Sequence, residues 1–258
     1  TTEIYTLSLH DALPIFILGP LDRLLRSPRI DADERRALQV MQRNARLLHR
    51  QVDNLLDLAR LDAGRLTLRY AGFDLAWRLR VLASNFDTVA HDRRITYHVA
   101  APERLDIQAD PEKCERILLN LVANAFKFVP DGGTIAIRLA VDGGTLQIDV
   151  DDSGPGVPEP LREAAFERFR QVEDGSRGPA GGTGLGLAIV HEFVRLHQGR
   201  VTVDASPLGG ARFTVRLPTQ APPGSVLHPA DMRGSPPTSP ELIALPHATD
   251  AQAPQHRP

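Results

Sequence analysis

The sequence has one cysteine, two lysines and one tryptophan among its 258 residues. The lone Cys114 excludes an internal disulfide and a multi-cysteine zinc site. The formal net charge is only −2, so the chain lacks the basic field of a dedicated nucleic-acid binder, and we expect no nucleic-acid partner. No apolar run reaches the roughly 20 residues that a membrane-spanning helix needs. We therefore expect a cytoplasmic fragment.

Both ends of the chain differ from its middle. Of the 21 prolines, 10 lie from Pro218 onward, and this stretch has no periodic apolar residues. We expect residues 218–258 to form a disordered Pro-rich tail rather than a small extra domain. Residues 1–15, TTEIYTLSLHDALPI, resemble one reading frame of a common sequencing-library adapter. We interpret them as an artefact, excluded from fold reasoning, with the natural-looking chain beginning at Phe16.

The first natural segment has a heptad pattern. Apolar residues recur at alternating steps of three and four: Leu38, Met41, Ala45, Leu48, Val52, Leu55 and Ala59. This spacing predicts a long helix over residues 33–62, and a shorter apolar stripe from Ile17 to Leu25 predicts a helix before it. We expect residues 16–63 to form a helical hairpin that pairs with a second copy as a four-helix bundle. The alternative is a hairpin packed on its own downstream domain.

Residues 64–217 have a mixed α/β pattern. Alternation predicts strands at 65–70, 95–99, 105–108, 134–141, 145–150, 201–205 and 211–217. Helical periodicity covers 75–89, 111–128 and 185–197. Asp142-Gly143-Gly144 predicts a tight hairpin. The fold class is therefore α+β, with helices on one face of a mixed sheet.

Three motifs in this region carry chemistry. Asn120, Asn124 and Lys127 fall on one face of the 111–128 helix, where amides and an ammonium can hold a hydrated divalent cation and phosphates. Alternatively, such amides cap neighbouring loops. Asp152-Ser153-Gly154-Pro155-Gly156 follows a strand and could present a carboxylate to the amine of adenine, or be a plain turn.

The third motif is rich in glycine and opens a helix. It comprises Gly181, Gly182, Thr183, Gly184, Leu185 and Gly186. Backbone N–H groups at a helix N-terminus bind phosphate, although this motif is neither a P-loop nor a dinucleotide fingerprint. The polar stretch before it, residues 171–180, is typical of a lid over a ligand.

In this order, and with Phe166-Glu167-Arg168-Phe169 between the second and third motifs, the set resembles the N, G1, F and G2 boxes of sensor histidine kinases of two-component systems. The resemblance covers residues 16–218. It implies a dimerisation and phosphoacceptor hairpin, here incomplete, followed at 64–217 by an ATP-binding domain. That domain is expected to be a Bergerat-type α/β sandwich. It also implies ATP and Mg²⁺ as cofactors, a homodimer, and a response-regulator receiver domain as partner.

The resemblance assigns roles to individual residues. Asn124 would be the Mg²⁺ ligand, with Asn120 beside it and Lys127 on phosphate oxygens. Asp152 would bind the adenine amine, with Gly154 and Gly156 closing on the base. Gly182, Thr183, Gly184, Leu185 and Gly186 would line the triphosphate. Phe166 and Phe169 would anchor the lid, with plain packing in the core as the alternative. The related ATPases have a glutamate that activates water where this chain has Asn120, which favours phosphoryl transfer over hydrolysis.

The phosphoacceptor histidine of the family has no convincing match. His10-Asp11-Ala12-Leu13-Pro14 imitates the acceptor motif, but Ala12 and Leu13 leave no Arg or Thr before Pro14. His10 also lies about two residues, or about 200° of helix, out of register with Gly19. We therefore expect a chain truncated at its N-terminus, without its acceptor. Any anchoring of the parent to the inner membrane would come from missing N-terminal regions.

The predicted function is that of a histidine kinase transmitter core. It binds Mg-ATP, and its parent transfers the γ-phosphoryl group to a histidine and then to a response-regulator aspartate. Two alternatives stay open: a dimeric nucleotide-binding scaffold without catalysis, and an ATP-hydrolysing member of the same superfamily.

Overall fold

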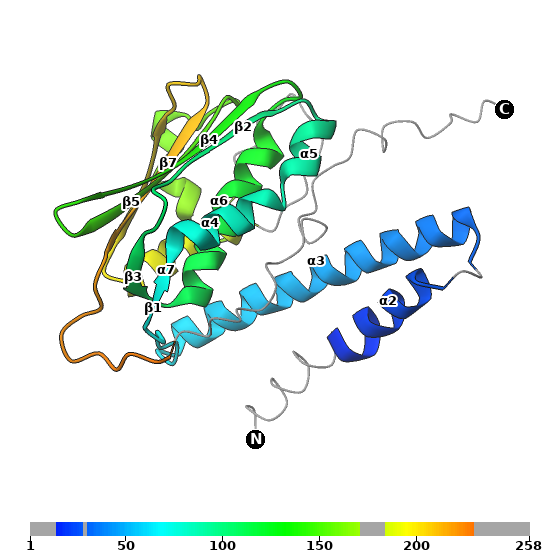
Figure 1. The fold of residues 1–258 in the computed structure, drawn as a ribbon, viewed down its shortest axis with the longest axis horizontal. Coiled ribbons are helices and arrows are strands. Elements are labelled where there is room, and N and C mark those ends of the chain that lie inside the picture. Colours follow the sequence, from blue (N-terminus) through cyan, green and yellow to red (C-terminus); the bar gives the residue numbers. More distant parts are fainter. Residues whose placement is uncertain (1–13, 28–29, 171–183, 230–258) are drawn as a thin grey trace. The chain divides into compact units, whose positions relative to one another are not determined.

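The computed structural model describes residues 14–27, 30–170 and 184–229 (Figure 1). Two compact units divide the chain, one ending at Leu66 and the next beginning at Thr67, a few residues beyond the boundary expected after residue 63. His10, Gly182 and Thr183 lie outside the described residues, as do nearly all of the 1–15 segment and most of the expected tail.

The first unit is a helical hairpin. A π-helical turn, η1 (Pro14–Leu18), leads into α2 (Gly19–Leu25), and the long α3 spans Ala32–Asp62. Asp31 begins α3 because its carboxylate accepts from the backbone N–H groups of Asp33 and Glu34, while the Glu34 carboxylate accepts from the N–H of Asp31. The heptad spacing thus predicted the helix correctly.

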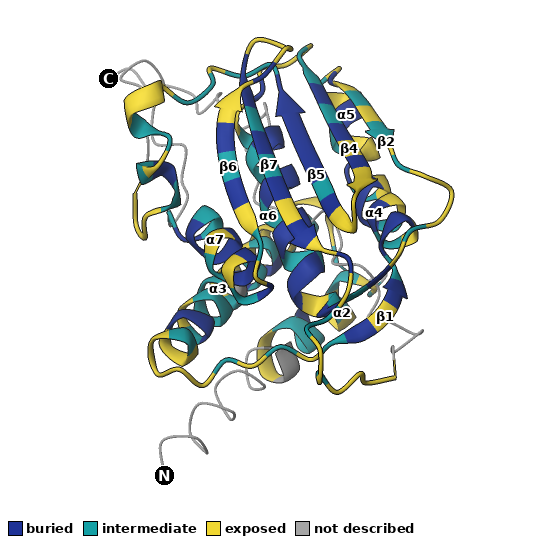
Figure 2. Cartoon of the chain, turned by 90° about the vertical axis from the view of Figure 1, so that its left-hand side faces the viewer, coloured by how far each residue is buried: buried dark blue, intermediate teal, exposed yellow. Residues whose placement is uncertain are grey.

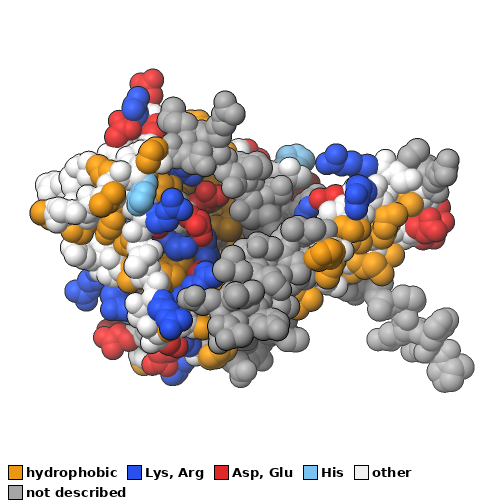
Figure 3. All heavy atoms as spheres, turned by 90° about the horizontal axis from the view of Figure 1, so that it is seen from below, with side chains coloured by type: hydrophobic (Ala, Val, Ile, Leu, Met, Phe, Trp, Pro, Cys, Tyr) orange, Lys and Arg blue, Asp and Glu red, His pale blue; other side chains and the backbone are white. Residues whose placement is uncertain are grey.

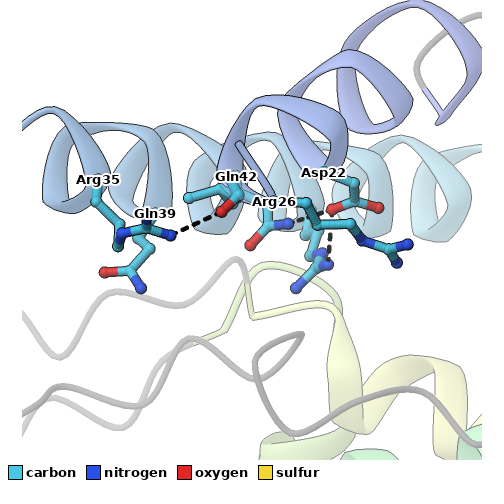
Figure 4. Close-up of a pocket in the computed structure, with 7 residues that line it drawn as sticks. Asp22, Arg26, Arg35, Gln39 and Gln42 are labelled. Carbon is cyan, nitrogen blue, oxygen red and sulfur yellow. Dashed lines mark hydrogen bonds and ion pairs between the residues drawn. The ribbon is translucent and has the colours of Figure 1, made fainter. Parts of the chain in front are cut away.

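Polar side chains join the two helices of the hairpin (Figure 4). Asp22 of α2 accepts a hydrogen bond from Gln42 and lies 3.5 Å from a guanidinium nitrogen of Arg46. Arg35 donates to the backbone oxygen of Leu25 at 2.7 Å. These contacts hold α2 against α3.

The heptad residues of α3 are only partly covered. Ala45 is buried, but the side chains of Met41, Leu48 and Leu55 are 57%, 54% and 50% exposed. These three residues are seven apart and therefore lie along one stripe of the helix. Hydrophobic side chains are visible along the hairpin in Figure 3. The hairpin therefore leaves an apolar stripe in contact with solvent.

The second unit is built on a five-stranded sheet in the order β2-β4-β5-β7-β6 (Figure 2). Its strands are β2 (Thr96–Ala100), β4 (Thr134–Asp142), β5 (Thr145–Asp152), β6 (Arg200–Ala205) and β7 (Ala211–Pro218). β2 pairs with β4 in parallel and the other pairs are antiparallel, so the predicted mixed sheet is confirmed. Gly143 and Gly144 both have positive φ, as the predicted tight turn between β4 and β5 requires.

Helices cover one face of this sheet (Figure 1). They are α4 (Leu75–Ser84), α5 (Asp87–Asp92), α6 (Pro111–Phe128) and α7 (Gly186–Leu196). α6 packs against β5, and α7 packs against β6 and β7. Between β5 and α7, two short 3-10 turns span Glu159–Leu161 (η2) and Ala164–Phe166 (η3). The hydrophobic core thus lies between the five-stranded sheet and the helices on one of its faces, as predicted for an α+β domain.

Three expectations about this unit were wrong. Residues 65–70 are not a strand; the chain instead forms β1 (Ala71–Asp74), which pairs with β3 (Asp106–Ala109) in a separate two-stranded sheet. The expected helix over 75–89 breaks at Asn85 because Phe86, fully buried, stacks on Phe126 at 4.8 Å.

The third error concerns the start of the tail. Pro218 ends β7, and the residues after it continue to pack on the fold. Thr219 accepts a backbone hydrogen bond from Gln108, and the backbone N–H of His228 donates to Tyr70 at 2.8 Å. Residues 218–229 therefore belong to the folded unit, because backbone pairing with β1 and β3 offsets the lack of apolar periodicity.

Candidate nucleotide-binding site

The site begins on α6, the helix with the two asparagines. Asp110 caps its N-terminus by accepting from the N–H groups of Glu112 and Lys113, both at 3.1 Å. The apolar face of the helix is fully buried: Ile117, Leu118, Leu121, Val122 and Ala125. Asn120, Asn124 and Lys127 are only partly buried. The predicted division between a packing face and a polar face is therefore confirmed.

Asn120 lies against the start of α7. Its amide nitrogen donates to the backbone oxygen of Arg116 at 2.8 Å. Its amide oxygen is 3.0 Å from the position that a Cβ on Gly186 would occupy. A Cβ at residue 186 would crowd the Asn120 amide, so glycine lets the start of α7 lie close to the asparagine face of α6.

Asn124 and Lys127 keep their polar groups available for a ligand. Within the part of the chain that the structure describes, Asn124 makes no side-chain hydrogen bond and no carboxylate pairs with Lys127. Burial lowers the pKa of the Lys127 ammonium, which lies 4.7 Å from the centre of the Phe128 ring. A partly desolvated cation without a counter-charge is well suited to an anionic ligand.

Asp152, at the end of β5, is 3% exposed. Its Oδ1 accepts from the backbone N–H of Gly154 at 2.8 Å and of Ala211 at 3.2 Å. Burial raises the pKa of the carboxyl, these two hydrogen bonds lower it, and nearby Asp151 adds to the rise. Among the described residues no donor reaches Oδ2. The carboxylate therefore has one oxygen fixed by the backbone and one left for an external donor.

Gly154 and Gly156 allow close backbone contacts at this carboxylate. A Cβ on Gly154 would lie 2.9 Å from Oδ1 of Asp152 and 3.0 Å from the backbone oxygen of Phe128. Gly156 has φ +72°, a conformation that L side chains rarely adopt. Both glycines are thus required by the local backbone. Their expected closing on the base stays a prediction.

Gly210 is a site residue that the sequence reasoning missed. A Cβ there would lie 2.2 Å from Oδ1 of Asp152 and 2.5 Å from the backbone nitrogen of Gly154. Its own N–H donates to the backbone oxygen of Asp152 at 3.1 Å. The sequence indicates this residue only through the pair Gly209-Gly210 before the last strand. Such a pair is equally typical of a plain hairpin turn.

The stems of the predicted lid meet at Gly184. The backbone N–H of Phe169 donates to the Gly184 oxygen at 3.1 Å. Gly184 has φ +67°, and a Cβ on it would lie 2.7 Å from the Phe169 carbonyl carbon. Phe166 packs in a T-shaped arrangement on Phe213, whereas the side chain of Phe169 is 66% exposed. Of the two expected lid anchors, only Phe166 is packed.

Leu185 differs from its expected role. Its side chain is 1% exposed and belongs to the core, so only its backbone could face a phosphate. Of the five residues expected to line the triphosphate, Gly184, Leu185 and Gly186 are described, and all three stand at the N-terminus of α7. The backbone N–H groups and dipole of that helix end favour an anion.

A divalent cation would have to rely on few protein ligands here. Among residues 14–27, 30–170 and 184–229, no group of three or more His, Cys, Asp or Glu side chains could hold a metal ion. The amide oxygen of Asn124 fits Mg²⁺, which retains several waters and shares the phosphates of its nucleotide.

Comparison with known proteins shows which family the chain resembles. Residues 109–221 match the family of histidine kinase-, DNA gyrase B- and HSP90-like ATPases. The chain is 46% identical over 211 residues to sensor histidine kinase TmoS of Ectopseudomonas mendocina, covering 81% of this chain and 22% of that protein. It is 43% identical over 208 residues to hybrid signal transduction histidine kinase D of Dictyostelium discoideum, covering 78% and 14%.

A solved structure extends the likeness over both units. The crystal structure of full-length ShkA in complex with AMPPNP has a TM-score of 0.67 and 31% identity, covering 86% of this chain and 46% of that one. The second unit is therefore an ATPase domain of the histidine kinase class. The chain belongs to the sensor histidine kinases, as the motifs indicated.

The chain spans less than a quarter of the length of the two curated relatives. No helix in the described ranges is long and apolar enough to cross a bilayer.

Proposed function

We propose that the domain beginning at Thr67 binds Mg-ATP and, in the parent protein, donates the γ-phosphoryl group to a histidine and then to an aspartate of a response-regulator receiver domain. The observation that carries the proposal is the convergence of three features: the polar face of α6, the half-satisfied carboxylate of Asp152, and the N-terminus of α7. A cytoplasmic location follows from the proposed use of ATP.

Asp152 would recognise the base. Its Oδ2 would accept a hydrogen bond from the exocyclic amine of adenine, while Oδ1 stays fixed by Gly154 and Ala211. Guanine has an oxygen at the position of that amine, which would face the carboxylate unfavourably. Fixing the carboxylate beforehand reduces the entropy lost on binding.

The phosphates would lie between α6 and α7. Lys127 would contact phosphate oxygens, and the N–H groups from Gly184 to Gly186 would bind others at the positive end of α7. Asn124 would hold Mg²⁺, which neutralises phosphate charge when bound. Asn120, an amide, cannot take a proton from water as a carboxylate can, which favours transfer over hydrolysis.

The hairpin would supply a homodimer. The exposed stripe of Met41, Leu48 and Leu55 repeats every seven residues, as at the seam of a helical bundle. A second copy offers the same stripe, so pairing would bury both. Such a four-helix bundle would present the histidine of the parent and the docking surface for the receiver domain.

His10 would not be the acceptor of this chain, because its surrounding residues and register differ from those of the family motif. We expect no acid-labile, ATP-dependent phosphate label that the substitution His10→Gln removes. Such a label would overturn this part of the proposal.

The magnesium role can be tested by titrating the full chain with ATP, with and without Mg²⁺, in a calorimeter. Wild type should bind more tightly with the cation, and Asn124→Ala should lose most of that gain. The control Asn44→Ala alters an exposed amide on α3 and should bind as wild type does. Failure of wild type to bind ATP, or a full magnesium effect in Asn124→Ala, would contradict the assignment.

A further inference from the structure

Arg93, directly after α5, binds the C-terminal turn of α6 at three points. Its Nε donates to Oδ1 of Asp131 at 2.8 Å, and its Nη2 donates to the backbone oxygen of Val129 at 2.7 Å. Its Nη1 donates to the backbone oxygen of Phe126. The Arg93 side chain is only 16% exposed, so these hydrogen bonds are largely shielded from water.

The chemistry of a helix end explains why Arg93 binds this turn. The last carbonyl groups of α6 have no partners within the helix and carry the negative end of its dipole. A planar guanidinium can serve two of them together, and Asp131 neutralises its charge. The backbone oxygen of Arg93 also accepts from Gly132 at 2.9 Å, so backbone and side chain hold the same turn.

The turn that Arg93 holds lies against the loop that orients the Asp152 carboxylate. Phe128 lies between the two carbonyl groups that Arg93 binds, and its own backbone oxygen is 3.0 Å from where a Cβ on Gly154 would be. Gly154 in turn donates its N–H to Asp152. A shift of the turn would therefore move the Gly154 backbone and the hydrogen bond that orients Asp152.

A second route runs through Gly133. A Cβ there would lie 2.6 Å from a methyl group of Val129 and 2.7 Å from the hydroxyl of Ser153. That hydroxyl accepts from the N–H of Thr134 at 2.8 Å. The turn after α6 and the loop after β5 therefore interlock, with no space for one to move without the other.

We propose that Arg93 is a positioning residue of the ATP site: by holding the C-terminal turn of α6 it fixes Lys127 on one side of the nucleotide and the Asp152–Gly154 loop on the other. Arg93 does not contact the nucleotide itself. This inference rests on the proposed ATP site, and it adds a residue from outside the α6, β5 and α7 motifs.

The test measures the affinity of the full chain for Mg-ATP by calorimetry in wild type, Arg93→Met and Arg93→Lys. Methionine keeps the length of the side chain without its donors, and we expect the dissociation constant to rise about tenfold. Lysine can serve one or two of the three acceptors, and we expect a rise of about threefold.

Arg80 offers a matched control. It clamps another turn of the same domain, donating to the backbone oxygens of Pro102 at 2.9 Å and of Glu103, neither of which belongs to the site. Arg80→Met should bind Mg-ATP within about twofold of wild type. Hydrogen exchange gives a second readout: Arg93→Lys should speed exchange at residues 126–133 and leave β5 and β7 unchanged.

The outcomes separate the two proposals. If wild type does not bind Mg-ATP, the proposed function is wrong. If wild type binds and folded Arg93→Lys binds equally well with unchanged exchange at 126–133, the inference about Arg93 is wrong. Should Arg93→Met not fold, Arg93→Lys decides alone. Equal losses of affinity in the Arg80 and Arg93 variants would show a general loss of stability and would also overturn the inference.

Discussion

The helical hairpin and the ATPase domain handle apolar surface in opposite ways. In the ATPase domain, large side chains such as Phe86, Phe126 and Phe193 are completely buried within one chain. In the hairpin, three heptad residues of α3 remain at least half exposed. The ATPase domain therefore completes its core within one chain, whereas the described residues of the hairpin leave an apolar face uncovered. Nucleotide binding should therefore depend only on the fold of a single chain. Burial of the apolar stripe of the hairpin should depend on a second chain and hence on the protein concentration.

The largest effect should follow from damaging the finished core. Phe126 stacks on Phe86 and makes a T-shaped contact with Tyr97 at 5.1 Å. Phe126→Ala should lower the free energy of unfolding of the ATPase domain by about 3–5 kcal/mol, because it leaves a cavity at a fully buried position. Denaturant unfolding followed by circular dichroism would measure it. A loss that shrinks at higher protein concentration would contradict a core complete within one chain.

A smaller effect, of a different kind, is expected in the hairpin. Leu48→Glu places a charge in the centre of the exposed stripe and should weaken dimerisation by about 2 kcal/mol or more, with little effect on the fold of the monomer. Sedimentation equilibrium would measure the dimer. Gln39→Glu, an exposed position on the same helix, is the control and should dimerise normally. A wild-type chain that stays monomeric at all concentrations would contradict the claim that the hairpin, unlike the ATPase domain, needs a second copy.

The smallest effect concerns pH. The buried His197 ring contacts the Phe193 oxygen through Nδ1 at 2.7 Å, and its Nε2 accepts from the Asp110 N–H at 3.1 Å, which fits a neutral ring. Burial lowers the pKa of His197, against opposing effects of the Phe193 carbonyl and Asp110. Because the unfolded chain then binds the proton more readily, this contribution is present above about pH 6.5 and is lost as pH falls.

His197→Gln should therefore flatten the decline of stability below about pH 6.5 and remove about 1 kcal/mol at neutral pH through a lost hydrogen bond. Thermal unfolding across pH 5.5–8 would show it. His91→Gln changes a side chain that is 90% exposed and should leave the slope unchanged. A His197 variant that keeps the slope of wild type would contradict the buried neutral ring.

The sequence predicted the parts of the site that depend on local periodicity. The polar face of α6 follows from residue spacing alone, and so does the strand expected at 145–150, which in the structure extends to Asp152. Gly210 and Arg93 could not be found in this way. Gly210 contacts Asp152 across a sequence separation of 58 residues, and Arg93 contacts Val129 across 36, so only the folded domain brings each pair together.

The fold itself was predicted well where an element buries one face. The long α3 and the mixed sheet both follow from the pattern, although the strand expected at 105–108 pairs in a separate two-stranded sheet. The errors fell where tertiary contacts decide: Phe86 interrupts a helical pattern because the core accepts its ring, and residues 218–229 are ordered by backbone pairing rather than by apolar side chains.

The central claim is that Asp152 reads adenine in a site preformed by one chain, and calorimetric titration with ATP and GTP tests it most directly. The control is Asp151→Asn, the neighbouring buried carboxylate, which binds Arg212 and Ser206 instead. Wild type should prefer ATP, and Asp152→Asn should weaken ATP binding about tenfold or more, since a hydrogen bond to a charged group contributes about 1.5–3 kcal/mol. Asp151→Asn should lose stability but keep the preference for ATP. Asp152→Asn that binds ATP like wild type while folded would contradict the account.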